Sequence, residues 1–365
     1  MREVLEEIET WRKQGKPVAL ATNVRKDGVV LRPLGAKMAM TIGDPHAGTR
    51  MEPEIAGSVT GGCIEGVVYE EAQVVLKNGE PKLLHYGVTS EETPWEVGLS
   101  CGGSLDVFVE SLDSPQWRAL YPTVKTCLEE NQLAAVATIL TGERTGGKML
   151  IRPDGHILGS LGVERMEAEV IHWALEQMGS QESGCRSFGA VDVFVDVLPP
   201  PSRMIVIGAV HIAIPLVKLA KTLGYHTMVI DPRRAFATHE RFPHADELVA
   251  EWPSTALEKL RLDESTYIVV ISHDEKLDNP ALKVALTNPT RYVGVLGSRR
   301  NLGRRFANLR DLGVTDEQLA RLRAPIGMHL GAVSPEEIAL SILAEMVAAK
   351  HEVLEHPRIR PAVAV

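Results

Sequence analysis

The chain has 365 residues, of which 44% are hydrophobic and 24% charged, a composition typical of a globular protein with room for two domains. Its formal charge of −9 argues against a general nucleic-acid binder. Residues 1–11 are acidic and amphipathic, unlike a secretory signal, and no apolar run approaches the roughly 18 residues that a membrane span needs. Four cysteines without paired spacing favour free thiols and a cytoplasmic protein.

The first informative element is a glycine-rich turn at residues 57–66, which places Cys63 just before a predicted helix at residues 67–76. Glycines expose backbone N–H groups, and the start of a helix attracts anions and favours a thiolate. We predict that Cys63 is a reactive thiol or soft ligand and that Glu65 accepts a proton or holds a ligand N–H. The candidate ligand-binding residues of this turn are Gly57, Ser58, Gly61 and Gly62. Alternatively, Cys63 is a small buried residue and Glu65 only complements the helix dipole.

A second turn, residues 98–103, repeats the pattern, with Cys101 as a second candidate catalytic thiol and Gly102 and Gly103 as candidate binding residues. An alternating segment, residues 106–110, follows as a predicted half-buried strand. Cys127 lies in a helix-like run and is predicted to pack in the core, whereas Cys185 is ambiguous.

The first 198 residues contain an internal duplication, which predicts two related α+β units at residues 17–110 and 134–196. Residues 57–65 align without gaps against residues 159–167, and residues 106–110 match residues 192–196. The second copy has Val163-Glu164-Arg165 in place of Gly61-Gly62-Cys63, and we align its Ser187 with Cys101. This difference favours a site in the first copy, although neutral divergence would also produce it.

The proline triplet at residues 199–201 marks a domain boundary, because consecutive prolines cannot continue a helix or a central strand. Short apolar runs at residues 204–208, 225–230, 267–271 and 292–296 then alternate with helical segments. This order predicts a Rossmann-like doubly wound parallel sheet at residues 203–350, followed by a tail at 351–365.

The turn after the first of these runs, Gly208 to Ala213, lies where a dinucleotide's pyrophosphate is usually bound, with His211 beside it. Val210 replaces the second glycine, and its side chain would obstruct the pyrophosphate. Asp231 lies where ribose hydroxyls are usually held, and Arg233 beside it could accept an added phosphate. Alternatively, Asp231 only ends a strand in a turn.

A Gly-Ser turn follows the last apolar run and begins a predicted helix. There we expect Ser298, Arg299 and Arg300 to bind an anion. Arg304, Arg305 and Arg310 are expected on the solvated face of that helix. Ser334 and Glu337 form a predicted capping box at the start of a closing helix.

At these residues the chain resembles the XdhC/CoxI family, the accessory proteins of xanthine dehydrogenase and related molybdenum hydroxylases. Residues 57–65 resemble the family's GSxxGGCxE turn and residues 98–103 its GLxCGG turn. Residues 208–213, 231–233 and 292–300 resemble its GAGHxA, DxR and YxGxxGSRR motifs, and residues 325–337 its C-terminal signature. Val210 stands where the family has glycine, and His329 where aspartate is usual.

The resemblance implies a maturation chaperone, rather than a classical enzyme, that binds sulfurated molybdenum cofactor and inserts it into an apo molybdenum hydroxylase. It also implies a cysteine desulfurase as sulfur donor, a possible contact between Cys63 and molybdenum, and a homodimer. The alternative is an NAD(P)-dependent oxidoreductase with a catalytic thiol. Val210 and the lack of an obvious proton donor speak against that alternative.

Overall fold

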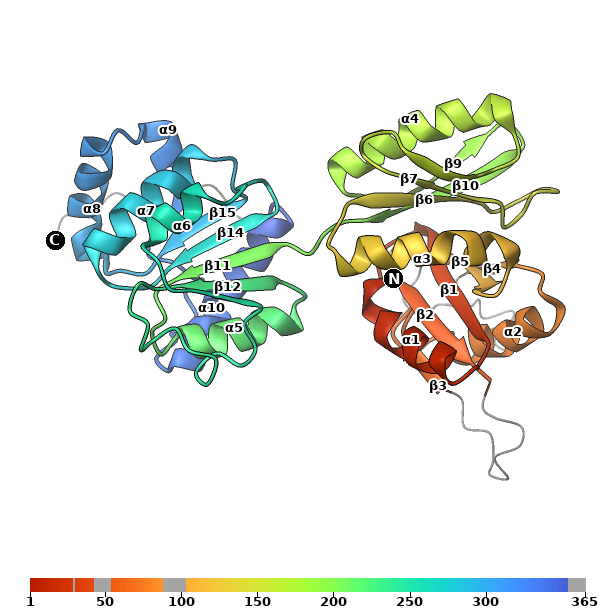
Figure 1. The fold of residues 1–365 in the computed structure, drawn as a ribbon, viewed down its shortest axis with the longest axis horizontal. Coiled ribbons are helices and arrows are strands. Elements are labelled where there is room, and N and C mark those ends of the chain that lie inside the picture. The colour runs from red at the N-terminus through yellow and green to blue at the C-terminus, as the bar shows by residue number, and fades with distance from the viewer. Residues whose placement is uncertain (29, 43–53, 88–102, 354–365) are drawn as a thin grey trace, which may run out of the picture. The chain divides into compact units, whose positions relative to one another are not determined.

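The computed structural model describes the chain except residues 29, 43–53, 88–102 and 354–365. By its contacts the chain divides into two compact units, Met1–Pro200 and Pro201–Val365. Each unit has its own sheets and hydrophobic core (Figure 1).

The N-terminal unit consists of two modules with the same order of elements. The first module runs through η1 (Arg2–Val4), α1 (Leu5–Lys13), β1 (Val18–Asp27), β2 (Lys37–Thr41), β3 (Glu54–Gly57), α2 (Glu65–Asn78), β4 (Lys82–Tyr86) and β5 (Ser104–Ser111). The second runs through α3 (Pro115–Glu129), β6 (Ala134–Ile139), β7 (Lys148–Ile151), β8 (Ile157–Ser160), α4 (Glu164–Ser180), β9 (Gly184–Phe188) and β10 (Val191–Leu198).

The two modules form antiparallel sheets with equivalent strand orders, β3-β2-β1-β5-β4 and β8-β7-β6-β10-β9. The predicted duplication is therefore confirmed. One expected correspondence is wrong. Ser187 pairs with Asp192 as His85 pairs with Asp106, so Ser187 takes the position of His85 and not that of Cys101. The expectation matched the edge strand β9, which carries Ser187, to the turn of residues 98–103, although β9 is equivalent to the edge strand β4.

Alternation along the strands explains the layers of this unit. On β1, Ala19 and Ala21 pack towards α2, while Val18 and Leu20 face the opposite way into a core shared with α1 and α3. In the second module, α4 covers the outer face of its sheet in the same manner. The inner faces of both sheets therefore meet, and small alanines leave room for the outer helices.

The C-terminal unit is built on six parallel strands in the order β13-β12-β11-β14-β15-β16. These strands are β11 (Arg203–Ile207), β12 (His226–Ile230), β13 (Glu247–Val249), β14 (Thr266–Val270), β15 (Tyr292–Val295) and β16 (Leu322–Arg323). The predicted doubly wound parallel sheet is confirmed. Its central strands are almost entirely apolar because helices cover both faces.

One face of this sheet packs against α5 (Ala213–Thr222) and α10 (Pro335–Lys350), as Figure 1 shows. The other carries α6 (Pro253–Glu258), α7 (Glu275–Thr287), α8 (Arg299–Asp311) and α9 (Asp316–Leu319). The capping box between Ser334 and Glu337 is present at the start of α10. In the part of the chain that the structure describes, no helix is long and apolar enough to cross a membrane.

Candidate functional site

The turn that carries Cys63 leaves the edge strand β3 and leads into α2, which starts two residues earlier than predicted. Gly57, the last residue of β3, has a φ of +72°. A Cβ there would lie 2.3 Å from the carbonyl oxygen of Lys37, so only glycine fits this position. The Asn23 side chain on β1 also donates to the Val59 carbonyl at 2.7 Å. The turn is thus fixed against the sheet at its base.

The Glu65 carboxylate lies inside this turn. It accepts hydrogen bonds from the hydroxyls of Ser58 at 2.6 Å and Thr60 at 2.7 Å. It also accepts from the backbone N–H groups of Thr60 at 2.8 Å, Gly61 at 2.9 Å and Gly62 at 2.9 Å. The N–H groups expected to hold a ligand anion are therefore occupied by a carboxylate of the chain itself. These contacts favour a role for Glu65 in positioning the turn; its predicted catalytic role stays untested.

The second module repeats this carboxylate contact without the cysteine. Glu167 accepts from the Ser160 hydroxyl at 2.6 Å and from the N–H groups of Leu161 at 2.6 Å and Gly162 at 3.0 Å. Its hydrogen bonds, that from Ser160 foremost, lower the pKa of Glu167. The carboxylate-filled turn is therefore common to both modules, whereas Cys63 is specific to the first.

Three cysteines fall in described residues, and their exposure differs. Cys63 is exposed, Cys127 on α3 is buried as predicted, and Cys185 on β9 is half-buried. Cys185 lies 3.4 Å from a guanidinium nitrogen of Arg25, and burial raises the pKa of its thiol although Arg25 opposes the rise. Cys101 and Gly102 lie outside the described residues, and Gly103 is a buried residue just before β5.

In the C-terminal unit, Gly208 follows β11 at the point where the strand order reverses, between β11 and β14. A Cβ on Gly208 would lie 2.6 Å from the Cα of Ser272, so glycine is needed here for packing against the loop after β14. His211 is exposed, and Val210 is partly buried against the core.

Asp231, the predicted ribose-binding residue, is fully buried. One of its oxygens accepts from the Ala209 N–H at 2.8 Å and from an Arg233 guanidinium nitrogen at 2.6 Å. The other accepts from the Arg233 backbone N–H at 2.9 Å and its Nε at 2.8 Å. Burial alone would raise the pKa of Asp231, but these bonds lower it. These bonds engage the carboxylate that was expected to hold a ribose and the Ala209 N–H, which belongs to the turn expected to bind a pyrophosphate.

The predicted anion site at residues 298–300 lies at the start of α8, with Ser298 as its N-cap residue. Arg300 is exposed, and the side chain of Arg299 is not described. The expectation of a solvated Arg305 is wrong: its side chain is buried and lies 3.1 Å from the Asp278 carboxylate. Asp278 also accepts from the Ser272 hydroxyl at 2.6 Å. Burial raises the pKa of Asp278, and Ser272 and Arg305 act against this rise.

Sequence reasoning missed the charged residues that join the two modules. Lys37 of the first module pairs with Asp196 of the second at 2.8 Å, and Lys148 of the second pairs with Glu110 of the first at 2.9 Å. The signals for them were lysine at both matched positions and an acidic residue at the end of both matched segments, Glu110 and Asp196. Both pairs are buried.

Two family models match this chain. The XdhC and CoxI family model matches residues 11–87 and 127–189, and the XdhC Rossmann domain model matches residues 204–346. The chain belongs to the XdhC and CoxI family.

Three bacterial proteins are similar to this chain in sequence. It is 25% identical over 335 residues to a probable xanthine dehydrogenase subunit of Bacillus subtilis, covering 92% of this chain and 93% of that one. It is 26% identical over 337 residues to the molybdenum cofactor insertion chaperone PaoD of Escherichia coli, covering 92% and 84%. It is also 31% identical over 243 residues to the uncharacterized protein YqeB of Escherichia coli, covering 61% of this chain but only 44% of YqeB.

The fold is also known from a crystal structure. A xanthine dehydrogenase from Bacillus halodurans superposes with a TM-score of 0.74 at 25% identity and covers 96% of each chain.

Proposed function

We propose that this protein is an accessory protein that binds molybdenum cofactor and inserts it into xanthine dehydrogenase or a related molybdenum hydroxylase. The observation that carries the proposal is the exposed Cys63 on its glycine turn. The equivalent turn of the second module has no cysteine. Membership of the XdhC and CoxI family and the likeness to a molybdenum cofactor insertion chaperone support it.

The chemistry of the turn suits a soft ligand. A thiolate binds molybdenum or a transferred sulfur better than a carboxylate does. Among the described residues, no three His, Cys, Asp or Glu side chains gather as they would around a bare metal ion. Cys63 would therefore contact a centre that brings its own ligands, as molybdenum does when held on a pterin. The base of the turn, fixed by Gly57 and Asn23, keeps Cys63 in place before the cofactor arrives.

The proposal includes two partners, an apo molybdenum hydroxylase that receives the cofactor and a cysteine desulfurase that supplies its sulfur. It also includes a homodimer and a cytoplasmic location. Cys101, Gly102 and Gly103 are proposed as further contacts of the cofactor. Within the C-terminal unit, His211, Ser298, Arg299 and Arg300 are proposed to bind an anionic group.

The test compares Cys63→Ala with Cys185→Ala in protein purified from cells that make molybdenum cofactor. Molybdenum content, pterin fluorescence and activation of a client hydroxylase are measured. We expect Cys63→Ala to lose bound cofactor and activation while it keeps the parent's melting temperature. The control Cys185→Ala should match the parent, because its thiol contacts Arg25 and not the turn. A Cys63→Ala protein that binds and delivers cofactor like the parent would refute the site assignment.

The second candidate function is an NAD(P)-dependent oxidoreductase with Cys63 as catalytic thiol. A Rossmann domain favours it. The bonds between Asp231, Ala209 and Arg233 speak against it, because they occupy the groups that a dinucleotide would need.

A further inference from the structure

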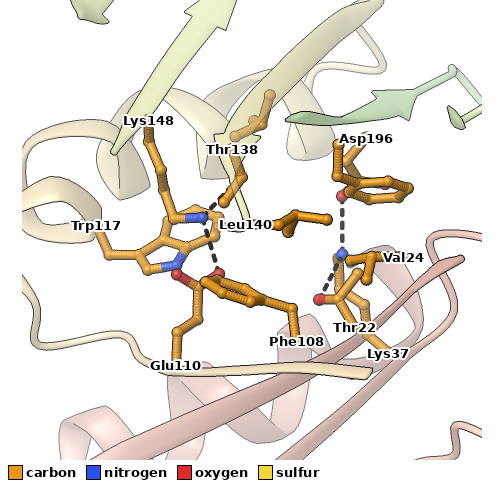
Figure 2. A pocket seen from close by; sticks show the side chains of 12 residues that line it. Thr22, Val24, Lys37, Phe108, Glu110, Trp117, Thr138, Leu140, Lys148 and Asp196 are labelled. Atoms are coloured by element: carbon orange, nitrogen blue, oxygen red, sulfur yellow. Dashed lines mark hydrogen bonds and ion pairs between the residues drawn. The ribbon is translucent and has the colours of Figure 1, made fainter. Parts of the chain in front are cut away.

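A small polar cavity lies where the inner faces of the two modules meet, in the N-terminal unit (Figure 2). Its lining includes three matched pairs of positions, one member from each module: Thr22 and Thr138, Lys37 and Lys148, and Glu110 and Asp196. Equivalent positions of the two modules therefore meet in this cavity, and nothing in the proposed cofactor site uses it.

Each lysine in the cavity has one N–H group beyond its hydrogen bond and its ion pair, and the Lys148 ammonium also lies 4.9 Å from the centre of the Trp117 ring. The Lys37 ammonium donates to the Thr22 hydroxyl at 3.1 Å and lies 2.8 Å from the Asp196 carboxylate. The Lys148 ammonium donates to the Thr138 hydroxyl at 2.8 Å and lies 2.9 Å from the Glu110 carboxylate. An ammonium group has three N–H donors, so each lysine has one more to offer.

Trp117 provides an independent observation. Its side chain lines the cavity and is only 4% exposed, yet its indole Nε1 has no hydrogen-bond partner among the described residues. Figure 2 shows the indole ring beside Lys148 and Glu110. A buried donor without a partner costs about 1–3 kcal/mol, so such groups in folded proteins usually have an acceptor.

The size and charge of the cavity limit the acceptor to one kind. The space open to the centre of a water molecule is about 20 Å³, and about 10–15 Å³ is enough to hold one water. A pterin or a nucleotide is far too large. Two ammonium groups and two carboxylates balance each other, so the lining offers no net charge to hold an ion.

We propose that this cavity is a binding site for an ordered water molecule that accepts the Trp117 indole N–H and bridges it to the ion pairs of both modules. The water completes the polar contacts between two modules whose matched residues face each other. The proposal is independent of the cofactor-binding function.

A crystal structure of the full chain at high resolution, from crystals soaked in sodium bromide, tests the proposal. We expect one water-sized density peak 2.7–3.2 Å from the Trp117 Nε1, a usual hydrogen-bond distance, and no anomalous signal there. An anomalous bromide peak would show an anion site instead. An empty cavity, or a direct bond from Trp117 to Glu110, would also overturn the proposal.

A solution measurement gives the same distinction without crystals. In protein labelled with ¹⁵N on tryptophan, the Trp117 indole resonance is assigned by its loss in Trp117→Phe. We expect this N–H to show a cross-relaxation peak to a long-lived water. Absence of that peak, in protein whose other indole resonances are unchanged, would contradict a bound water.

Discussion

At the scale of single residues, Glu65 lies two residues after Cys63, and its hydrogen bonds hold the turn that carries this thiol. Burial alone would raise the pKa of Glu65, but hydrogen bonds from Ser58, Thr60 and Gly61 lower it to about 2 from an ordinary 4.5. A carboxylate with a lowered pKa stabilises the folded state above its unfolded pKa, and this contribution is lost as the pH falls through the folded value. The turn should therefore loosen between about pH 4.5 and 2 and keep its full stability at neutral pH.

Replacing Glu65 with glutamine tests this positioning role. The amide cannot accept from all the N–H and hydroxyl donors, and a donor of the buried Thr60 left unsatisfied costs about 1–3 kcal/mol. We expect Glu65→Gln to lower the melting temperature, to change the rate at which Cys63 is alkylated and to reduce bound cofactor. The matched variant Glu167→Gln should lower the melting temperature in a similar way and leave cofactor content unchanged.

Alkylation is followed by peptide mapping, with buried Cys127 as an internal reference. Normal cofactor retention in Glu65→Gln would contradict the proposed role of Glu65 in positioning Cys63. An equal loss in both variants would assign the effect to stability alone.

At the scale of elements, the two modules are joined by two buried ion pairs, each with one residue from either module. Burial lowers the pKa of Lys148 even though Glu110 acts to raise it. The cost of burying the charge is thus not fully offset by its partner. Buried pairs of this kind are often less stabilising than apolar residues of similar volume, whereas one charge left alone is strongly destabilising.

The pair Lys148 and Glu110 allows this to be measured. We expect Lys148→Met and Glu110→Leu each to cost roughly 3–5 kcal/mol of unfolding free energy, because each leaves a buried charge unpaired. The double variant should recover most of that loss. Urea unfolding of all three proteins gives the coupling energy, and Lys77→Met, at an exposed position on α2, is the control. If the double variant loses the sum of both single effects, the pair does not act as a unit.

The helices and strands could be predicted because their residue patterns repeat locally. Contacts between distant segments leave no such pattern and could not be predicted. The apolar runs after residue 203 predict strands because burial on both faces dictates their side chains. The alternation of residues 106–110 also predicts a strand, but β5 is buried on both faces and not on one as expected. The partner of Lys37 could not be read in this way, since Asp196 lies far along the chain. For the same reason Arg305 was expected in solvent, although Asp278 on α7 buries it.

In the candidate site, the glycines could be predicted from sequence because a tight turn with positive φ needs them. Cys63 could be singled out because it is a thiol between that turn and a helix start. The contacts that fill the turn could not be foreseen. An acidic residue near a glycine turn can face a ligand or its own backbone, and only the geometry around Glu65 distinguishes the two.

At the scale of the whole molecule, the question is whether the parallel-sheet unit binds a dinucleotide. Its strand order is the one in which NAD lies across the reversal point between β11 and β14. At that point Asp231 is bonded to Ala209 and Arg233, and Val210 stands in place of a glycine. The fold therefore provides the place for a dinucleotide, but there the Asp231 carboxylate is already bonded to Ala209 and Arg233.

We accordingly expect no binding of NAD⁺, NADH, NADP⁺ or NADPH at 1 mM, measured as melting temperature and by calorimetry. A ligand present at 100 times its dissociation constant stabilises the folded state by about 2.7 kcal/mol, which a melting curve detects readily. Arg233→Ala serves as the informative variant, because it frees the Asp231 carboxylate for a ribose and keeps the Ala209 contact. Arg234→Ala, at the neighbouring position, is the control. Stabilisation of the parent by any of the four dinucleotides would contradict this expectation and support the oxidoreductase function. Stabilisation that appears only in Arg233→Ala would identify Arg233 as the group that excludes the dinucleotide.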